Sequence, residues 1–314
     1  MKKNFKIIAI LLLSVLLLAG CTKRTTVTNK ETNETKNIVT NILCKPSTDE
    51  KRIEYSTYKD KLIVDYDKLP ECTQLKVNTG GYEGLWISLF VKPFAWVLVK
   101  VAVLISKTGI RIGAASALSI MLMGAFLRAL MIPITKKSMN MNTNMQKAQK
   151  DLNRLEKKYA GKDDKEAMMA KSQEMMAIYK KYDINPMSSC LFAFLQLPIF
   201  FAFLEALYRV PLFFENNFLV FNLGTTPLEG LRAGNYWYII LVLLIIGATY
   251  FSFKFMNNTS GDEMQQKQMK MMSNFMIIFI GFMSFSLPTS IALYWIVSNG
   301  FTIIQNMILK KGKK

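Results

Sequence analysis

The feature that most constrains this fold is a series of long apolar segments with few charged side chains. Four such segments follow residue 110, and the last is long enough for two crossings that fold at Pro288. A helix needs roughly 20 apolar residues to cross a hydrocarbon core of about 30 Å. We therefore predict an all-α integral membrane protein whose five spans cover residues 111–135, 187–209, 235–256, 271–287 and 289–309.

The composition excludes most hydrolase chemistry. The chain of 314 residues contains no histidine, which rules out histidine general bases, Ser-His-Asp triads and zinc-histidine sites. Its four cysteines have no C-x-x-C spacing, and neither a Walker motif nor a dinucleotide-binding motif is present. We therefore predict a protein that is not an enzyme and that uses no cofactor and no metal.

The N-terminus has the parts of a secretory signal. A lysine-rich start precedes an apolar stretch over residues 7–18, the small residues Ala19 and Gly20, and then Cys21. This ending resembles a bacterial lipoprotein signal, in which the cysteine is acylated and becomes the mature N-terminus. We expect residues 1–20 to be removed and a lipid on Cys21 to hold the mature N-terminus outside the cell membrane, with an ordinary signal anchor as the alternative.

Two further segments precede the spans. Residues 21–83 are polar and predict an extracellular tether or a small lobe, in which Cys44 and Cys72 are equally compatible with a disulfide and with free thiols. Residues 84–110 are apolar, but four basic side chains fall on one stripe of the predicted helix: Lys92, Lys100, Lys107 and Arg111. Because a lysine at bilayer depth costs about 2.5 to 3.5 kcal/mol, we predict an interfacial amphipathic helix, with a tilted span as the alternative.

Loop charges predict the orientation of the spans. Residues 136–186 hold 12 Lys and Arg against 7 acidic residues, and the tail 310–314 is basic, whereas residues 210–234 hold one Arg and two Glu. Basic loops stay in the cytoplasm. We therefore predict a cytoplasmic C-terminus and a cytoplasmic segment 136–186.

Segment 136–186 carries two heptad patterns on either side of a turn at Gly161. The first is Met145, Ala148, Leu152, Leu155 and Tyr159, and the second is Met168, Ser172, Met175, Tyr179 and Tyr182. Such patterns predict an antiparallel helical hairpin. Its basic faces suit anionic lipid headgroups, ribosomal RNA or a targeting factor, and they equally suit a face that is merely solvated.

Polar residues within the spans are the candidate site. Arg128 has no acidic residue on its own helix, and the small Gly124 lies one turn before it. A guanidinium at this depth requires water or a polar partner, which predicts a wet cavity, with snorkelling to the interface as the alternative. Gln196 lies in the second span, and the last span has a polar stripe of Trp295, Ser298, Asn299, Thr302, Gln305 and Asn306. Glu205 is the only acid in a span, which argues against a proton relay.

Several of these segments, in this order over residues 81–309, resemble the YidC/Oxa/Alb family of membrane protein insertases in its bacterial lipoprotein form. They are R-A-L-M-I-P with Arg128 and Pro133, K-K-Y-A-G-K, I-Y-K-K-Y-D-I-N-P ending at Pro186, C-L-F-A-F-L-Q-L-P-I-F from Cys190, and L-P-T-S-I-A-L-Y-W-I-V-S-N followed by Gln305. The chain departs from the family's G-C-L-P at Ser189 and Phe192, and from its P-x-G-L at Ser290 and Ile291. Ser252 stands near the place where the family often has a glutamine.

The resemblance implies an insertase and chaperone for nascent membrane proteins that hydrolyses no nucleotide. It implies five spans around a hydrophilic groove that opens to cytoplasm and lipid, and it assigns to the groove Arg128, Gly124, Gln196, Trp295, Ser298 and Ser252. The implied partners are nascent membrane proteins and membrane lipids, with the ribosome, the signal recognition particle pathway and the Sec translocon as further candidates and no specific nucleic-acid sequence. A small channel or secondary transporter is the alternative, although the chain has no inverted repeat. A scaffold for cytoplasmic complexes is a third reading.

Overall fold

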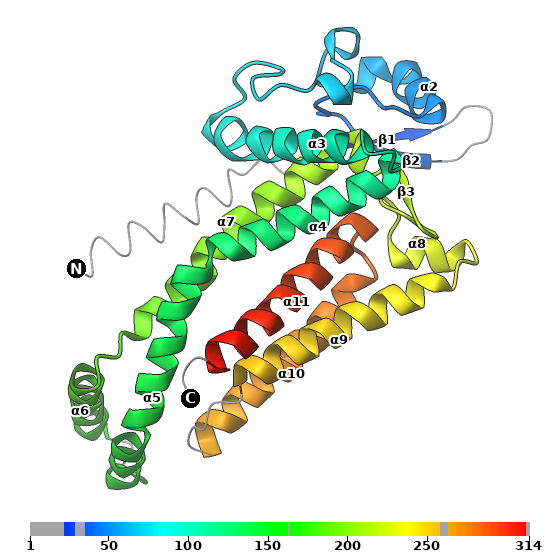
Figure 1. Cartoon of the computed structure of the whole chain (residues 1–314). Coiled ribbons are helices and arrows are strands. Elements are labelled where there is room, and N and C mark those ends of the chain that lie inside the picture. Colours follow the sequence, from blue (N-terminus) through cyan, green and yellow to red (C-terminus); the bar gives the residue numbers. More distant parts are fainter. Residues whose placement is uncertain (1–21, 29–34, 163, 258–262, 312–314) are drawn as a thin grey trace. The chain divides into compact units, whose positions relative to one another are not determined.

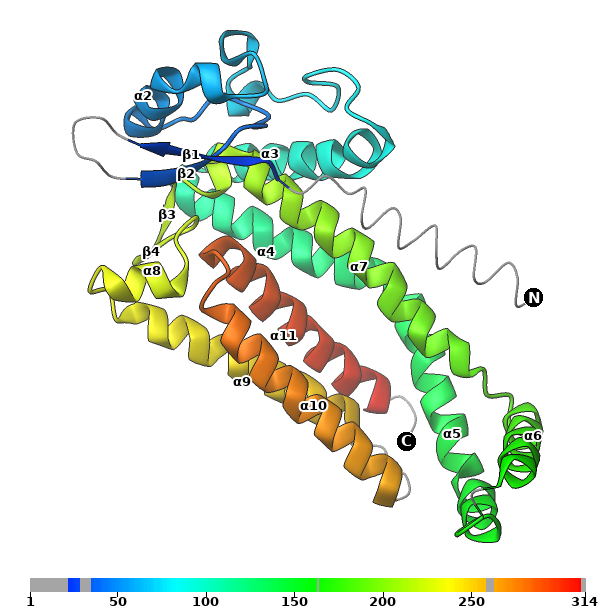
Figure 2. The ribbon, with the colours of Figure 1, turned by 180° about the vertical axis from the view of Figure 1, so that it is seen from behind.

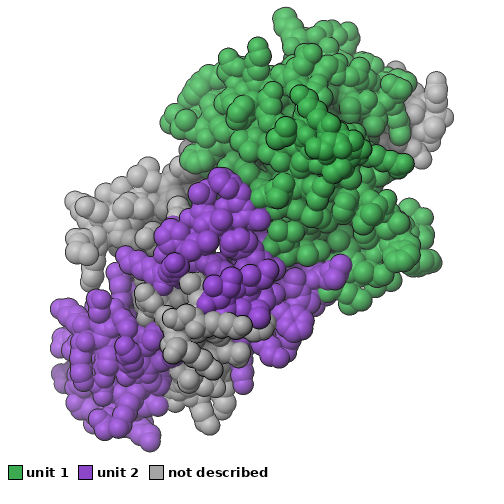
Figure 3. Space-filling view, viewed as in Figure 1, with its two compact units in different colours: residues 1–124, 196–243, 284–297 green, residues 125–195, 244–283, 298–314 purple. Residues whose placement is uncertain are grey.

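The computed structural model describes residues 22–28, 35–162, 164–257 and 263–311, so the predicted signal peptide and Cys21 lie outside the described residues (Figure 1). The chain divides into two compact units, drawn in different colours in Figure 3. Unit 1 comprises residues 1–124, 196–243 and 284–297, and unit 2 comprises residues 125–195, 244–283 and 298–314.

Helices make up most of the described chain. They are α2 (Asp49–Thr57), α3 (Lys92–Ser106), α4 (Ile112–Leu130), α5 (Ile132–Lys158), α6 (Lys165–Lys181), α7 (Pro186–Arg209), α8 (Pro227–Arg232), α9 (Trp237–Asn257), α10 (Glu263–Ser284) and α11 (Thr289–Lys311). A π-helical segment, Ile87–Val91, leads into α3. The strands are β1 (Arg24–Thr28), β2 (Thr35–Val39), β3 (Asn217–Phe218) and β4 (Phe221–Asn222).

Four helical segments of the described residues are long and apolar enough to cross a membrane. They are Ile87–Ser106, Ile112–Leu130, Trp237–Lys254 and Thr289–Ile308, and a shorter apolar helix covers Ser273–Ser284. The fold is thus predominantly helical, as predicted. Within the first predicted span, residues 111–135, helix α4 ends at Leu130, because a new helix begins at Ile132 with Pro133 in its first turn.

The predicted charged stripe along residues 84–110 is wrong at Lys92. The Lys92 side chain is 2% exposed, and its Nζ lies 2.9 Å from Oε1 of Glu83. Lys92 therefore belongs to the buried face of α3, which also includes Val91, Ala95, Leu98, Val99 and Ala102. Helical periodicity compares Lys92 only with residues on its own helix. Its ion-pair partner, Glu83, lies in the preceding loop, so the pattern could not reveal the pair.

A small lobe precedes α3. Strands β1 and β2 pair antiparallel, with Arg24 opposite Val39 and Thr28 opposite Thr35, and both views show them with α2 beside α3 (Figure 2). The core of the lobe is Val27, Ile38, Val39, Ile42, Tyr55 and Leu69. Burial raises the pKa of the Tyr55 hydroxyl, to which the backbone N–H of Val39 donates at 3.3 Å.

The lobe is joined to the C-terminal end of α7 and to the loop that follows it. The N–H of Leu43 donates to the carbonyl of Arg209 at 2.8 Å, which satisfies a backbone oxygen at the end of α7. In the following loop, Glu215 accepts the N–H of Ser47 at 2.9 Å. These bonds hold residues 43–47 against the end of α7 and the loop after it.

A disulfide closes the lobe. Cys44 and Cys72 are bonded, with their Cα atoms 4.8 Å apart and 28 residues separating them in sequence. Both cysteines are buried. The sequence left this pairing open because spacing alone does not report whether the chain brings two cysteines together.

Removing this disulfide is expected to destabilise the lobe by about 3 to 4 kcal/mol, the loop-closure entropy of a loop of roughly 30 residues. We would replace Cys44 and Cys72 by serine together and measure the thermal unfolding of the lobe and its resistance to protease. Replacing Cys190 by serine is the matched control, because Cys190 lies outside this loop. An equal effect of both changes would contradict the assignment of stability to the crosslink.

Candidate functional site

Within unit 2, Arg128 and Ser298 meet directly. Arg128 is half-buried near the end of α4, and its Nε donates to the hydroxyl of Ser298 at 2.5 Å. Ser298 lies on α11 and is 1% exposed. Two of the residues predicted for the groove are thus brought together across 170 positions of sequence.

Neutral polar groups on α9 and α11 extend the polar surroundings within unit 2. Nδ2 of Asn299 donates to the hydroxyl of Thr249 at 3.3 Å, and both residues are buried. Ser252, which was predicted for the groove, is buried three residues after Thr249 on the same helix. The sequence analysis missed Thr249, although its spacing of three from Ser252 places both on one face of α9.

The predicted polar stripe of α11 is largely buried. Ser298, Asn299, Gln305 and Asn306 are each less than 9% exposed, whereas the hydroxyl of Thr302 donates to the Ser298 carbonyl of its own helix. Within the stripe, Ser298 bonds across to α4 and Asn299 bonds across to α9, whereas Thr302 bonds within α11. Nε2 of Gln305 and Nδ2 of Asn306 are buried without a hydrogen-bond partner among the described residues. Buried polar groups of this kind hold membrane helices together or line polar cavities.

The other three predicted groove residues belong to unit 1. Half-buried Gln196 has an oxygen without a hydrogen-bond partner among the described residues, and half-buried Trp295 has its ring 6.0 Å from the ring of Phe200. At Gly124, an added Cβ would lie 3.0 Å from Cδ2 of Tyr294. The small size of Gly124 thus admits an aromatic ring at that point. Periodicity could not have identified Tyr294 as its neighbour, because the contact joins distant helices.

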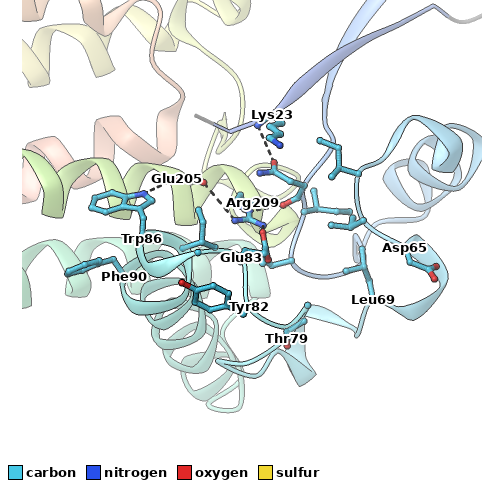
Figure 4. A pocket seen from close by; sticks show the side chains of 18 of the residues that line it. Lys23, Asp65, Leu69, Thr79, Tyr82, Glu83, Trp86, Phe90, Glu205 and Arg209 are labelled. Atoms are coloured by element: carbon cyan, nitrogen blue, oxygen red, sulfur yellow. Dashed lines mark hydrogen bonds and ion pairs between the residues drawn. The ribbon is translucent and has the colours of Figure 1, made fainter. Parts of the chain in front are cut away.

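Unit 1 also contains a cluster of charged residues at the C-terminal end of α7, shown in Figure 4, in which Arg209, Glu205 and Lys92 are buried. Nη2 of Arg209 lies 2.6 Å from Oε2 of Glu83, and Nη1 lies 3.8 Å from Oε1 of Glu205. The Trp86 indole donates to Oε2 of Glu205 at 3.1 Å. Burial acts to raise the pKa of Glu83, but its hydrogen bonds and charge interactions with Lys92 and Arg209 outweigh burial and hold that pKa below its usual value.

Helices α5 and α6 pack as an antiparallel pair with a repeated clamp at each end. Lys181 Nζ lies 2.7 Å from Oδ2 of Asp151, which also accepts the Tyr182 hydroxyl at 3.0 Å. At the other end, Lys158 Nζ lies 2.5 Å from Oε1 of Glu174, which accepts the Tyr159 hydroxyl at 2.9 Å. At the C-terminal end of each helix, a Lys-Tyr pair therefore binds a carboxylate of the other helix.

The predicted heptad contacts hold on α5 but fail at the start of α6. Ala148 and Leu155 are buried on α5, whereas Met168 is 63% exposed and Ser172 is also exposed. The polar clamps, which involve neither residue, join the two helices instead. Heptad spacing detects apolar seams and does not register such clamps.

The hairpin is expected to lose its clamps in acid. The hydrogen bonds from Lys181 and Tyr182 lower the pKa of Asp151, and those from Lys158 and Tyr159 lower the pKa of Glu174. A carboxylate with a lowered pKa stabilises the fold above its ordinary pKa of about 4, and the contribution disappears as the pH falls through the lowered value. The distance between probes on α5 and α6 should therefore increase below about pH 4.

Asp151→Asn with Glu174→Gln should separate the helices already at neutral pH. Glu156→Gln with Glu166→Gln is the matched control, because it also removes two charges and these residues make no ion pair among the described residues. A pH response that persists unchanged in the Asp151 and Glu174 variant would contradict this account.

Comparison with known proteins identifies the family. The profile of the family described as 60Kd inner membrane protein matches residues 110–314. The chain belongs to the YidC/Oxa/Alb family. It is 30% identical over 248 residues to a protein of Oceanobacillus iheyensis named membrane protein insertase YidC, which covers 77% of this chain and 91% of the relative. It is also 32% identical over 243 residues to Bacillus subtilis membrane protein insertase MisCA, which covers 77% of this chain and 86% of the relative.

These matches confirm the YidC/Oxa/Alb family that the motifs indicated. The profile covers α4 to α11, and hence all six predicted groove residues. Residues 22–109, with the disulfide and with Glu83 and Lys92 of the charged cluster, precede the matched YidC/Oxa/Alb region. The lobe that precedes α3 therefore has to be interpreted from its own contacts.

Proposed function

We propose that this chain inserts nascent membrane proteins into the cell membrane and assists their folding, without nucleotide hydrolysis. Membership of the YidC/Oxa/Alb family and the names of its relatives support this activity. The observation that carries it is the half-buried guanidinium of Arg128, held by Ser298 within helices of membrane-spanning length. A cation at this depth attracts an anionic segment that hydrocarbon would exclude.

The insertion mechanism follows from charge and partition. An acidic or polar tail of the nascent protein enters a hydrophilic groove near Arg128. Ser298, Ser252 and Gln196 supply neutral polar groups to the groove. Gly124 lies on the same helix as Arg128, and Trp295 lies on the same helix as Ser298. The apolar segment of the substrate then partitions into lipid, gaining about 0.8 kcal/mol per buried CH₂. A few leucines offset the transfer of the tail, so no nucleotide is required.

The hairpin of α5 and α6 would receive substrates on the cytoplasmic side. Segment 136–186 has 12 basic and 7 acidic residues, a net charge of +5, and Met168, Met169 and Met176 are 49 to 63% exposed. Basic faces suit ribosomal RNA or anionic headgroups, and flexible thioethers suit varied apolar segments. Ribosome, signal recognition particle and Sec translocon are the proposed partners. Undiminished insertion after replacement of α6 by a neutral helix would remove the hairpin from this role.

The proposed topology has a multi-pass membrane protein with a lipid on Cys21 and the lobe outside, and with the C-terminus in the cytoplasm. The lipoprotein signal and the basic segments support it. The disulfide of the lobe also supports an external position, since disulfides persist in oxidising compartments.

Reconstitution tests the proposed activity. Purified protein in vesicles should insert a single-span reporter with a short acidic tail in the absence of nucleotide, and vesicles without the protein should not. The alternative, a small channel or secondary transporter, predicts flux of ions or solutes through the same vesicles. Flux without reporter insertion would overturn the insertase proposal.

A further inference from the structure

We propose that an outer cavity of unit 1 binds acyl chains of the lipid attached to Cys21. The inference rests on the lipid anchor proposed above. The cavity has a volume of about 1160 Å³, which matches or exceeds the roughly 300 to 1,000 Å³ of ordinary small-molecule pockets. Figure 4 shows it between Trp86 and Phe90 on one side and Leu69 of the lobe on the other, with Lys23 at its edge.

The walls of the cavity are suited to an apolar ligand. Ile63 on the lobe is 60% exposed, and Leu85 and Leu89 beside α3 are 69% and 62% exposed, although all three line the cavity. Large apolar side chains that remain accessible around one cavity mark a binding surface for apolar groups. A hydrocarbon chain would remove all three from water at once.

The charged groups in the wall are engaged with one another. Glu83 pairs with Lys92 and Arg209, and the carboxylate of Glu205 faces Arg209 and accepts the Trp86 indole N–H. On the lobe side of the wall, Lys68 pairs with Asp65 at 2.8 Å. The charged side chains that line the cavity are the acids Asp65, Glu83 and Glu205 and the bases Lys23, Lys68 and Arg209, so the wall offers no net charge to an anion. The cavity therefore favours the hydrocarbon part of a lipid over a phosphate headgroup.

The short chain between Cys21 and Lys23 limits how far the lipid attachment point can be from the cavity. The backbone of Lys23 is fixed on both sides: its N–H donates to Oδ1 of Asn41 at 3.2 Å, and its carbonyl accepts the N–H of Thr40 at 2.8 Å. Lys23 lines the cavity. Because two residues span at most about 7 Å, the chain length keeps Cys21 within about that distance of Lys23. A tethered acyl chain thus has an effective concentration there that a free membrane lipid lacks.

The experiment uses the full-length protein in cells fed an alkyne analogue of palmitic acid. A photo-crosslinking amino acid replaces Ile63, which lines the cavity, or Ile53, which is 66% exposed on the same lobe and does not line it. Mass spectrometry identifies the crosslinked lipid and, separately, the mature N-terminus. We expect the Cys21 lipopeptide to be crosslinked at position 63 with at least tenfold higher yield than at position 53.

Filling the cavity provides the second measurement. Leu89→Trp should lower the yield at position 63 at least fivefold, whereas Leu104→Trp, a change at a 67% exposed leucine of α3 that does not line the cavity, should leave it unchanged. If the N-terminus is acylated but position 63 crosslinks only to free phospholipid, or to no lipid, the proposed binding of the acyl chains in the cavity is overturned and the lipid anchor stands. A mature N-terminus without a lipid overturns both. Loss of insertion in the reconstituted assay bears on neither outcome.

Discussion

Replacing Arg128 by alanine is expected to slow insertion of a reporter with an acidic translocated tail by about tenfold or more. A unit charge about 8 Å from a carboxylate contributes about 2 kcal/mol at an effective dielectric constant of 20, and about 1.4 kcal/mol corresponds to a tenfold change in rate. A reporter with a neutral tail should be affected less. The measurement is the initial rate of insertion into vesicles at equal protein content.

Two further variants separate charge from packing at this position. Arg128→Lys should keep most of the activity, because attraction of an acidic tail requires a positive charge and not a bidentate guanidinium. Ser298→Ala removes the hydroxyl that accepts from Nε of Arg128 at 2.5 Å and should reduce the preference for acidic tails while the charge remains. Ser119→Ala is the matched control, since the buried Ser119 hydroxyl bonds to the carbonyl of Ser116 on its own helix.

The contrary result is equally specific. If Arg128→Ala inserts the acidic reporter at the normal rate, and cysteines placed at positions 124 and 128 are shielded from water on the cytoplasmic side, a charged groove is not the mechanism. Normal insertion by Arg128→Ala combined with loss of activity in Arg128→Lys would instead indicate a purely steric role.

Periodicity and charge predicted the features that depend on local sequence. Apolar length identified the long helices, and the positions of Arg128 and Ser298 in them led to a pair that the structure brings together. Local sequence carries this information because a membrane restricts a helix to few alternatives: its length is fixed, and its polar residues must find partners. The groove itself stays a prediction.

The features that escaped prediction depend on partners distant in sequence. Lys92 is buried because Glu83 lies beside it, and Gly124 faces the ring of Tyr294 across 170 residues. The fold of the lobe could not be predicted from the sequence either, because its core is made of single apolar residues scattered through a polar segment. No local pattern specifies which of these residues meet.

The buried arginine at the end of α7 provides the strongest test of how the lobe is attached. Arg209 is 0% exposed; its Nε donates to the carbonyl of Asn41 at 2.7 Å, and its guanidinium faces Glu83 and Glu205. Arg209→Met should destabilise unit 1 by about 3 to 5 kcal/mol, because it leaves Glu205 without a cation, Glu83 with Lys92 alone, and a lobe carbonyl without its donor. Arg232→Met, at an exposed arginine of α8, should change stability by less than about 0.5 kcal/mol.

The pH dependence distinguishes lost charge pairing from lost packing in the Arg209 variant. The wild-type ion pairs lower the pKa of Glu83, so their contribution is complete above the ordinary pKa of a glutamate, about 4.3, and is lost as the pH falls through the lowered value. In Arg209→Met, Glu83 keeps only its pair with Lys92, so its protonation costs less stability than it does in the wild type. The difference in thermal unfolding midpoint between wild type and variant, measured in nanodiscs, should therefore narrow below about pH 4.3. A gap that stays constant from pH 7 to pH 3.5 would show that Arg209 holds the lobe by packing and by its bond to Asn41, and not by charge.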